Sequence, residues 1–432
     1  MKADATAAAL WDRLPARSQA LCAEAAQAGE ALGGAVYLVG GSVRDLLLGG
    51  SQVDLDVVVV GDALAVAAAV AARRGATVRS PSEFLTTAID IPGGGHLDLA
   101  TARQETYPAP AKLPEVSRAG IEEDLRRRDF SVNAMALRLT ADGAADLVDP
   151  CGGREDLAAG LIRILHPRSL MDDPTRIIRA ARFEQRLGFA LEPVTEVALR
   201  DAVRQGLLEQ VTGPRVRDEL VKLLAEPDPC RPLARLQELG ALSRALPGVH
   251  FDEVAAQWLR WAPAAVAALG VPGRAWTFLL GALCARGDTD RATERLRLDA
   301  AAQSVVQAMA RAAGSPLPRL LGGRAGMRDS QVAGALEPGA NGERVLYWLR
   351  GNAVARRRLE RDAAVLRNMR SDIDGNDLQA EGVPPGRAIG VGLRAARNAK
   401  LNGQADRDAQ ARAAVAAIAE WARPGRRLRT RV

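Results

Sequence analysis

The sequence predicts an N-terminal domain that mixes strands and helices, of α/β or α+β class, followed by an all-helical remainder. Before about residue 150, short runs rich in β-branched residues alternate with a helical stretch at Ala63–Arg73. Beyond Pro150, Ala-, Leu- and Arg-rich segments are punctuated by Pro and Gly, which is typical of consecutive helices. The predicted strands are Val36–Val39, Leu55–Val60, Ala88–Ile91 and Leu97–Ala100.

The composition is that of a folded protein that does not enter a membrane. Of the 432 residues, 48% are apolar and 25% charged, values that exclude disorder over most of the length. The longest apolar stretch, Ala63–Ala72, is far shorter than the roughly 18 residues that a bilayer span needs. Charged residues interrupt the N-terminal Ala-rich stretch, so we expect no signal peptide, no membrane partner and a cytoplasmic location.

The positions of the cysteines and histidines argue against a metal site built from these residues. The four cysteines are far apart and form no C-x-x-C pair, so neither a disulfide framework nor a zinc site is indicated. No two of the three histidines lie at metal-ligand spacing. Any metal ion is therefore expected to be held by carboxylates.

The net charge of +6 is concentrated in the last part of the chain. From Arg344 to Val432 there are 18 Arg and one Lys against nine acidic residues, a local charge of +10. Such an arginine-rich segment favours a nucleic-acid partner. A solvated helical surface in an Arg-rich protein would carry the same charge, so charge alone does not decide between the two.

The most informative segment is Leu38–Gly49, which contains Gly40 and Gly41 directly after a predicted strand. Two glycines let the backbone turn tightly and approach a ligand closely. A helix beginning near Ser42 would direct its first N–H groups at an anion, and Arg44 in its first turn could grip a phosphate oxygen. The dinucleotide-binding and P-loop patterns are both absent.

About a dozen residues later, Asp54 and Asp56 lie two positions apart in a run that otherwise has the composition of a strand. The two-residue period of a strand puts both carboxylates on one face. Two like charges held this close are unfavourable unless a cation lies between them, and hard divalent cations such as Mg²⁺ prefer oxygen ligands. Together with the Gly-Gly turn, this pair suggests two-metal phosphoryl transfer.

A second charged segment, Glu122–Ala136, has three consecutive arginines between Asp124 and Asp129. By itself it is better explained as a charged cap that leads into a core helix. It points to a functional site only in combination with the Gly-Gly turn and the Asp54–Asp56 pair.

A third segment, Met171–Phe183, is predicted to form a helix with Pro174 in its first turn and Asp172 or Asp173 as its cap. Neighbouring Arg and Asp side chains can present donors and an acceptor in an arrangement that resembles the edge of a base. Four charged residues recur at steps of three, so their side chains lie within reach of one another: Asp173, Arg176, Arg179 and Arg182.

These three segments resemble the class II tRNA nucleotidyltransferases, a family of CCA-adding enzymes and bacterial poly(A) polymerases in the DNA polymerase β superfamily. The resemblance is densest from Tyr37 to Gly188 and returns at Ile373–Gly390. It implies an α+β fold: a polymerase β-like nucleotidyltransferase head with a mixed sheet, followed by an all-helical neck, body and tail. The expected domains are residues 1–150 (head), 151–225 (neck with the nucleotide-templating helix), 226–313 (body) and 314–432 (basic tail, tRNA binding).

The resemblance also implies roles for individual residues. The catalytic, metal-binding carboxylates would be Asp54 and Asp56. The nucleotide-binding residues would be Gly41, Arg44, Arg128, Asp129, Asp173, Arg176, Arg179 and Arg182. Asp129 is similar to a residue linked to ribose recognition, and Asp173 with Arg176 would pair with the edge of CTP or ATP. Asp172 departs from the Glu found in many members, which affects the expected cap geometry and not the pair.

The implied activity is addition of CCA, or of its terminal A, to tRNA 3′ ends from CTP and ATP, with Mg²⁺ and without a nucleic-acid template. Residues 103–122 resemble a flexible loop that CC-only enzymes lack, which disfavours CC-only addition, although a surface loop without a specificity role would look the same. Poly(A) synthesis by the same motifs is the alternative within the family. A non-catalytic RNA-binding protein is the alternative from another class, and the intact Asp54–Asp56 pair argues against it.

Overall fold

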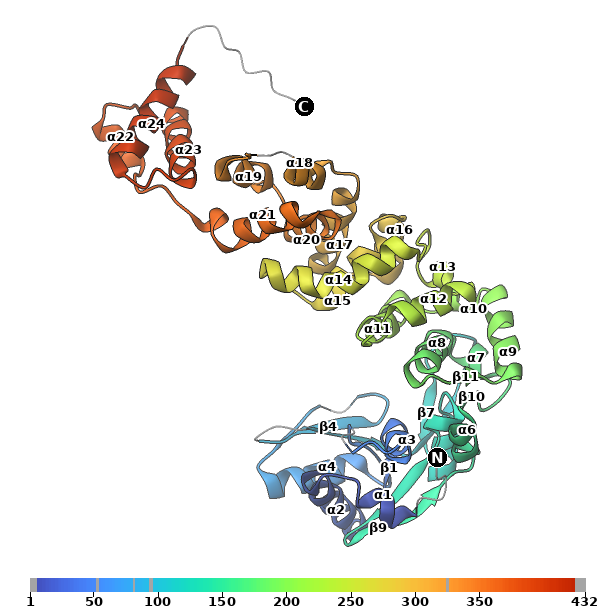
Figure 1. Ribbon diagram of the computed structural model, residues 1–432. Coiled ribbons are helices and arrows are strands. Elements are labelled where there is room, and N and C mark those ends of the chain that lie inside the picture. The colour runs from blue at the N-terminus through green and yellow to red at the C-terminus, as the bar shows by residue number, and fades with distance from the viewer. Residues whose placement is uncertain (1–5, 52–53, 81, 93–95, 324–325, 424–432) are drawn as a thin grey trace. The chain divides into compact units, whose positions relative to one another are not determined.

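The structure, a computed structural model, describes residues 6–51, 54–80, 82–92, 96–323 and 326–423. It divides into two compact units, Met1–Ala245 and Leu246–Val432. Every strand of the described residues lies in the first unit, so the predicted change from mixed to helical structure is confirmed (Figure 1). The four domains expected from the sequence are a finer division than these two units and stay a prediction.

The first unit is built on a seven-stranded mixed sheet with strand order β3-β4-β5-β2-β1-β8-β9. Strands β2 and β5 run parallel, and the other neighbours are antiparallel. Two smaller pairs are the antiparallel hairpin β6–β7 and the parallel pair β10–β11. The strands are β1 (Ala35–Val39), β2 (Asp56–Val60), β3 (Thr77–Val78), β4 (Thr86–Asp90), β5 (His96–Thr101), β6 (Arg103–Thr106), β7 (Glu115–Arg118), β8 (Ala136–Thr140), β9 (Gly143–Val148), β10 (Leu161–Ile162) and β11 (Ala190–Leu191).

All four predicted strands are confirmed, with ends that differ by at most two residues. Strand β2 begins at Asp56, one residue later than predicted, so Asp54 lies in the segment before the strand and only Asp56 belongs to it. The hairpin β6–β7 falls within the segment expected to be a flexible loop, and the stretch from 107 to 114 joins its strands.

Some helices of the first unit pack on this sheet, and the later ones, from α8 onward, pack mainly on one another. Their bounds are α1 (Ala7–Trp11), α2 (Ala16–Ala31), α3 (Gly41–Leu47), α4 (Ala63–Arg74), α5 (Ile121–Arg126), α6 (Gly153–Ala159), α7 (Ser169–Asp172), α8 (Arg176–Leu187), α9 (Pro193–Arg204), α10 (Leu207–Gln210), α11 (Gly213–Leu224), α12 (Cys230–Glu238) and α13 (Leu242–Ala245), with a 3-10 turn η1 at Ser131–Asn133. Helices α2 and α4 lie side by side and pack on the sheet (Figure 1). Asp62 caps the start of helix α4, because its carboxylate accepts the N–H of Ala65, and Gly75 in the left-handed conformation caps its end.

The third charged segment forms two helices where one was predicted. A residue that precedes proline is pushed toward extended backbone, and Asp173 adopts φ −133° and ψ 93° before Pro174. Helix α7 therefore ends at Asp172, and α8 begins at Arg176, two residues later than the proline. Asp173 caps the turn between them, because its Oδ1 accepts the N–H of Thr175 at 3.0 Å.

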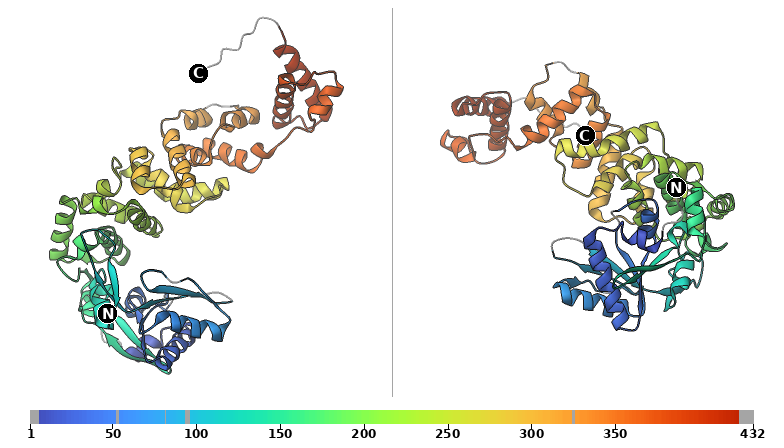
Figure 2. Two further views of the ribbon diagram at one scale, coloured as in Figure 1. Left: turned by 180° about the vertical axis from the view of Figure 1, so that it is seen from behind. Right: turned by 60° about the horizontal axis from the view of Figure 1, so that its bottom comes forward.

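The second unit is helical throughout its described residues (Figure 2, yellow to red). Its helices are α14 (Glu253–Leu269), α15 (Ala275–Cys284), α16 (Thr289–Leu296), α17 (Ala300–Ala313), α18 (Leu317–Gly323), α19 (Asp329–Leu336), α20 (Asn341–Arg350), α21 (Ala353–Ala364), α22 (Gly375–Ala380), α23 (Arg387–Leu401) and α24 (Arg407–Trp421), with a 3-10 turn η2 at Leu366–Asn368. Arg356 of α21 stacks on Trp261 and Trp348, which join α14 and α20 to it. Within the described part of the chain, no helix is both long and apolar enough to cross a membrane.

Candidate active site

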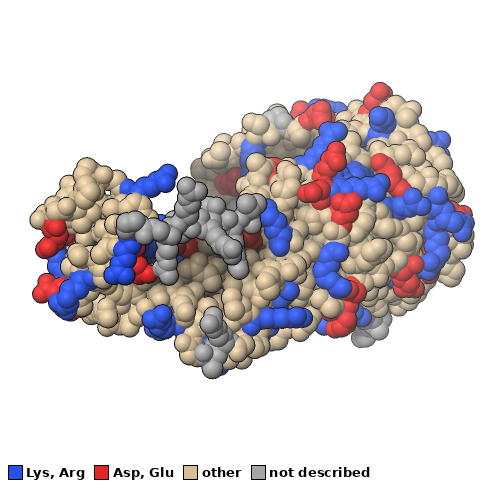
Figure 3. Space-filling view, turned by 90° about the horizontal axis from the view of Figure 1, so that it is seen from above, with Lys and Arg blue, Asp and Glu red and all other residues tan. Residues whose placement is uncertain are grey.

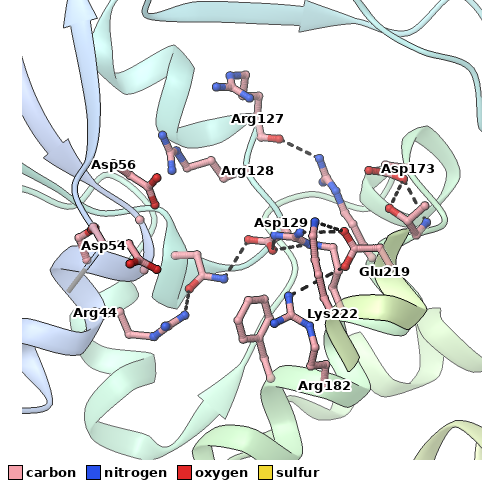
Figure 4. A pocket seen from close by; sticks show the side chains of 18 of the residues that line it. Arg44, Asp54, Asp56, Arg127, Arg128, Asp129, Asp173, Arg182, Glu219 and Lys222 are labelled. Atoms are coloured by element: carbon pink, nitrogen blue, oxygen red, sulfur yellow. Dashed lines mark hydrogen bonds and ion pairs between the residues drawn. The ribbon is translucent and has the colours of Figure 1, made fainter. Parts of the chain in front are cut away.

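One pocket of about 850 Å³ in the first unit is lined by all ten residues that the sequence singled out (Figure 4). It lies where the end of β1 and the start of β2 meet helices α8 and α11. The predicted residues that line it are Gly41, Arg44, Asp54, Asp56, Arg128, Asp129, Asp173, Arg176, Arg179 and Arg182. The geometry thus brings together segments that are up to about 140 residues apart; the roles of these residues stay predictions.

The Gly-Gly turn makes a close backbone approach possible. Gly40 has φ +69°, a left-handed conformation that favours glycine, and a Cβ there would lie 2.8 Å from Nη1 of Arg128. Helix α3 starts at the next residue, and Arg44 is its fourth residue. The Arg44 side chain is buried and donates to Asp45 Oδ1 at 2.8 Å and to Asn133 Oδ1. Arg44 is therefore held at the pocket wall before any ligand arrives.

Three carboxylates face the pocket from adjacent chain segments: Asp54, Asp56 and, missed by the sequence analysis, Asp98. Asp56 opens β2, and the parallel register places it directly beside Asp98 of β5. Burial and the neighbouring Asp98 charge raise the pKa of Asp56, and Arg128 opposes this. The signal that could have found Asp98 is its place in the alternating strand pattern that begins at His96.

This donor set suits a hard divalent cation, since carboxylate oxygens repel one another until a cation neutralises them. Within the described residues, no group of three or more Asp, Glu, His or Cys side chains is arranged to hold a metal by itself. Mg²⁺ is usually bound by one or two carboxylates together with waters and substrate phosphates. A pair such as Asp54 and Asp56 therefore fits a cation that binds together with a nucleotide.

Arg128 is fixed by a fully buried carboxylate. The Asp124 carboxylate accepts a hydrogen bond from Nη2 of Arg128 at 3.0 Å on Oδ2 and another from Nη2 of Arg127 at 2.7 Å on Oδ1. Burial alone would raise the pKa of Asp124, but the two guanidiniums outweigh it and hold the pKa below its usual value. Arg127 also pairs with Glu105 of β6 at 2.8 Å, so the arginine-rich turn is tied to the β6–β7 hairpin.

Asp129 is buried at the centre of a hydrogen-bonded row that crosses the pocket floor (Figure 4). Its Oδ1 accepts Nδ2 of Asn133 at 3.1 Å, and its Oδ2 accepts Nε of Arg179 at 2.9 Å. Because Asn133 also accepts from Arg44, the row connects α3 to α8. Burial opposes ionisation of Asp129, yet Arg179 lowers its pKa to about 2. Asp129 is thus ionised and paired with Arg179, and its predicted part in ribose recognition stays a prediction.

The arginines of α8 have different partners, although they share one helix face. Arg176 is buried and donates to Ser169 Oγ and, at 2.8 Å, to the Arg127 carbonyl. Arg182 lies 3.2 Å from Glu226 Oε1, while its Nε and the Oε2 of Glu219 are buried without a hydrogen-bond partner. Glu219 and Lys222 of α11, which form an ion pair at 2.8 Å, complete this wall; the sequence analysis missed both.

Phe183 gathers three guanidinium groups around one aromatic ring. The guanidinium carbons of Arg44, Arg179 and Arg182 lie 5.3, 5.7 and 4.5 Å from the ring centroid. Phe130 meets the same ring edge-on at 6.0 Å. Cation–π attraction at this distance orients guanidiniums without using their hydrogen-bond donors. The donors that remain can serve an anionic ligand.

Comparison with known proteins agrees with this geometry. The chain matches the family model described as "Poly A polymerase head domain" over residues 36–163, and the one described as "Probable RNA and SrmB-binding site of polymerase A" over residues 188–252. It is 43% identical over 229 residues to the A-adding tRNA nucleotidyltransferase of Geobacter sulfurreducens, which covers 53% of this chain and 26% of that protein. It is 42% identical over 216 residues to the CC-adding tRNA nucleotidyltransferase of Deinococcus radiodurans, which covers 50% of this chain and 56% of that protein. The chain therefore spans about a quarter to a little over half the length of these relatives.

Solved structures extend the similarity to nearly the whole chain. A CCA-adding enzyme in apo form II has a TM-score of 0.81 and 31% identity, covering 95% of this chain and 99% of that one. A Thermotoga maritima CCA-adding enzyme complexed with tRNA has a TM-score of 0.72 and 28% identity, covering 94% and 97%. The expected α+β head with a helical remainder is therefore confirmed.

Proposed function

This chain belongs to the family of tRNA nucleotidyltransferases and bacterial poly(A) polymerases, and we propose that it adds CCA, or the terminal A alone, to the 3′ end of tRNA from CTP and ATP. The observation that carries the proposal is the single pocket in which paired carboxylates, guanidiniums and the turn at Asp173 meet. The A-adding and CC-adding relatives and the tRNA complex of a similar enzyme support it.

In the proposed reaction, the 3′-hydroxyl oxygen of the RNA bonds to the α-phosphorus of the nucleotide, and the bond from that phosphorus to pyrophosphate breaks. Asp54 and Asp56 would hold divalent cations, Mg²⁺ by preference, which supply activation of the hydroxyl and neutralisation of the charge on pyrophosphate. Asp98, beside Asp56, adds negative charge that favours cation binding at this edge of the sheet.

Arg44 and Arg128 would position the triphosphate. Both side chains are held in place from behind, Arg44 by Asn133 and Arg128 by Asp124, so little rotamer entropy is lost when phosphate oxygens arrive. Guanidiniums suit phosphate because they offer several donors in a fixed plane. Their contribution is orientation and electrostatic stabilisation, not proton transfer.

Base selection is proposed for the turn that precedes α8. Asp173 and Arg176 lie on the pocket wall and supply an acceptor and donors, the minimum needed to recognise one edge of a base. Arg179 and Arg182 continue the same wall and add positive charge. A protein surface in this position would replace a nucleic-acid template.

RNA binding is proposed for the arginine-rich second unit. Figure 3 shows Lys and Arg side chains interspersed with Asp and Glu on one face of the molecule, so phosphate contacts would be spread over many side chains. Structured RNA is recognised largely through its shape and backbone, which suits such a surface. A tRNA substrate also fits the cytoplasmic location expected from the sequence.

A primer-extension gel tests the proposal. Transcripts of tRNA that end at the discriminator base, at C and at CC are incubated with CTP, ATP or both, in the presence of Mg²⁺. Growth of all three to a fixed CCA end identifies a complete CCA-adding enzyme, and addition of one A to the CC transcript alone identifies an A-adding enzyme. A ladder of many A residues would instead establish poly(A) synthesis. Absence of any extension would refute a transferase function.

A further inference from the structure

The carboxylate of Asp173 uses its two oxygens unequally. Oδ1 accepts three hydrogen bonds: from the Thr175 N–H at 3.0 Å, from Thr175 Oγ1 at 2.6 Å and from Arg215 Nη2 at 2.8 Å. No donor among the described residues bonds Oδ2. The side chain is 22% exposed and lines the pocket, so Oδ2 is the oxygen available to a ligand.

Two of these donors come from the turn itself, whereas Arg215 comes from another helix. Arg215 lies in the first turn of α11, behind Pro214, and does not line the pocket. Its guanidinium reaches two acceptors at once, with Nη2 on Asp173 and Nη1 on the carbonyl of Ala111 at 2.8 Å. Arg215 thus ties the local turn to α11, which Thr175 cannot do.

The second acceptor is itself held firmly. Ala111 is buried, with φ +60°, and its N–H donates to the carbonyl of Met171 in α7 at 3.1 Å. The guanidinium therefore bridges two backbone segments that are already joined, and its plane is set by both contacts. A lysine ammonium at this position is a point charge that could not reproduce the two-armed fork.

We propose that Arg215 is a positioning residue for nucleotide selection: it holds Asp173 so that Oδ2 alone faces the base and accepts a hydrogen bond from an exocyclic amine. This inference rests on the proposed function. Cytosine presents its N4 amine and adenine its N6 amine, whereas guanine and uracil present carbonyl oxygens at the corresponding positions. An oriented carboxylate oxygen attracts the first pair and repels the second. A carboxylate free to rotate would discriminate less.

The test compares kcat/KM in the full-length protein for ATP against GTP on the transcript that ends at CC, and for CTP against UTP on the transcript that ends at C. Arg215→Ala is expected to lower both ratios about 10- to 100-fold, the usual weight of one to two hydrogen bonds to a charged group. Arg215→Lys keeps the charge without the fork and is expected to recover only part of the loss. Arg217→Ala is the matched control, because Arg217 is on the same helix and pairs with the exposed Asp218.

A purely structural role predicts a different result. If Arg215→Ala slowed all four nucleotides equally, or left both ratios unchanged, the inference would be wrong. In an Asp173→Asn background, adding Arg215→Ala should change the ratios little, because the group that Arg215 positions has already been altered. Independent effects of the two substitutions would contradict the positioning role.

Failure of the proposed function can be told apart from failure of this inference. Equilibrium binding of ATP and GTP to the wild type and to Arg215→Lys, measured without tRNA, reports base discrimination even if no primer is extended. A wild type that prefers ATP, with the preference reduced in the variant, supports the inference whatever the acceptor proves to be. An unchanged preference in the variant overturns it.

Discussion

Asp129 accepts two hydrogen bonds from Arg179, one of them from Nε at 2.9 Å, and this partly buried ion pair joins the turn after α5 to helix α8. Asn133 and Glu219 flank the pair on either side. Each charge has partners on more than one segment, so the pair forms part of the frame that sets the width of the pocket.

We expect Asp129→Asn to lower the free energy of unfolding by about 2 kcal/mol at pH 7, because it leaves the partly buried Arg179 guanidinium without its main counter-charge. The pKa of Asp129 is lowered to about 2, so the stabilisation from its ionised form is complete above the ordinary carboxyl range near pH 4. It is lost as the pH falls through about 2. Urea unfolding at pH 7 and pH 2 should therefore show a smaller difference between wild type and variant at the lower pH. Asp201→Asn, which breaks the exposed pair with Arg204, is the control and should change stability little.

Asp54→Asn and Asp56→Asn should each reduce nucleotide addition by about 1,000-fold or more, because loss of a cation removes several kcal/mol of transition-state stabilisation. Thermal melting should stay close to that of the wild type, since both side chains line the pocket and neither is part of the apolar core. Asp146→Asn, an exposed carboxylate on the edge strand β9, provides the comparison and should remain active. Chelation of divalent ions by EDTA should reproduce the loss, and added Mg²⁺ should reverse it. An active Asp56→Asn enzyme would show that the carboxylate assignment is wrong.

Asp98→Asn should weaken the binding of the cation without abolishing the reaction. Asp98 lies beside Asp56 in the sheet, and its charge contributes to the attraction for a cation. We expect the Mg²⁺ concentration for half-maximal rate to rise about 10-fold, which corresponds to loss of about 1 to 2 kcal/mol of attraction at an effective dielectric near 20. A magnesium titration of the extension rate measures this shift. No shift would mean that Asp98 acts only within the sheet.

Phe183→Leu should raise KM for ATP and CTP by about 10-fold, because three guanidiniums lose cation–π contacts worth roughly 0.5 kcal/mol or more each. The leucine keeps most of the apolar volume, so the cost in stability should be about 1 to 2 kcal/mol. Steady-state kinetics and thermal melting separate the two effects. Phe278→Leu changes a buried phenylalanine of the second unit and should lower stability without raising KM.

The sequence predicted those parts of the site that depend on local pattern. The Gly40–Gly41 turn, the Asp54–Asp56 pair and the arginine row of α8 are contiguous motifs, and the structure brings them to one pocket. The boundary of α8 was misplaced because the extended backbone imposed before Pro174 outweighs the tendency of proline to occupy a helix first turn.

The residues that were missed depend on tertiary pairing. Asp98 gains its significance only from its register beside Asp56, and Arg215 only from the packing of α11 against the turn at Asp173. Phe183 would pass for an ordinary core residue until three guanidiniums are seen around its ring. Most of these contacts join residues some 40 to 140 positions apart, so spacing within the chain does not signal them. The exceptions are Arg179 and Arg182, which lie close to Phe183 on α8 itself.

The parallel pairing of β2 with β5 makes the site depend on the register of the two strands. Side chains alternate between the two faces of a strand, so a slip of one residue in this pairing would carry Asp98 to the opposite face from Asp56. The same slip would carry Leu97 and Leu99, which are buried, to the opposite face, so the alternation of β5 penalises it strongly. The leucines that hold β5 in the core therefore also keep Asp98 beside Asp56, and a substitution that disturbed them would be expected to lower stability and cation affinity together.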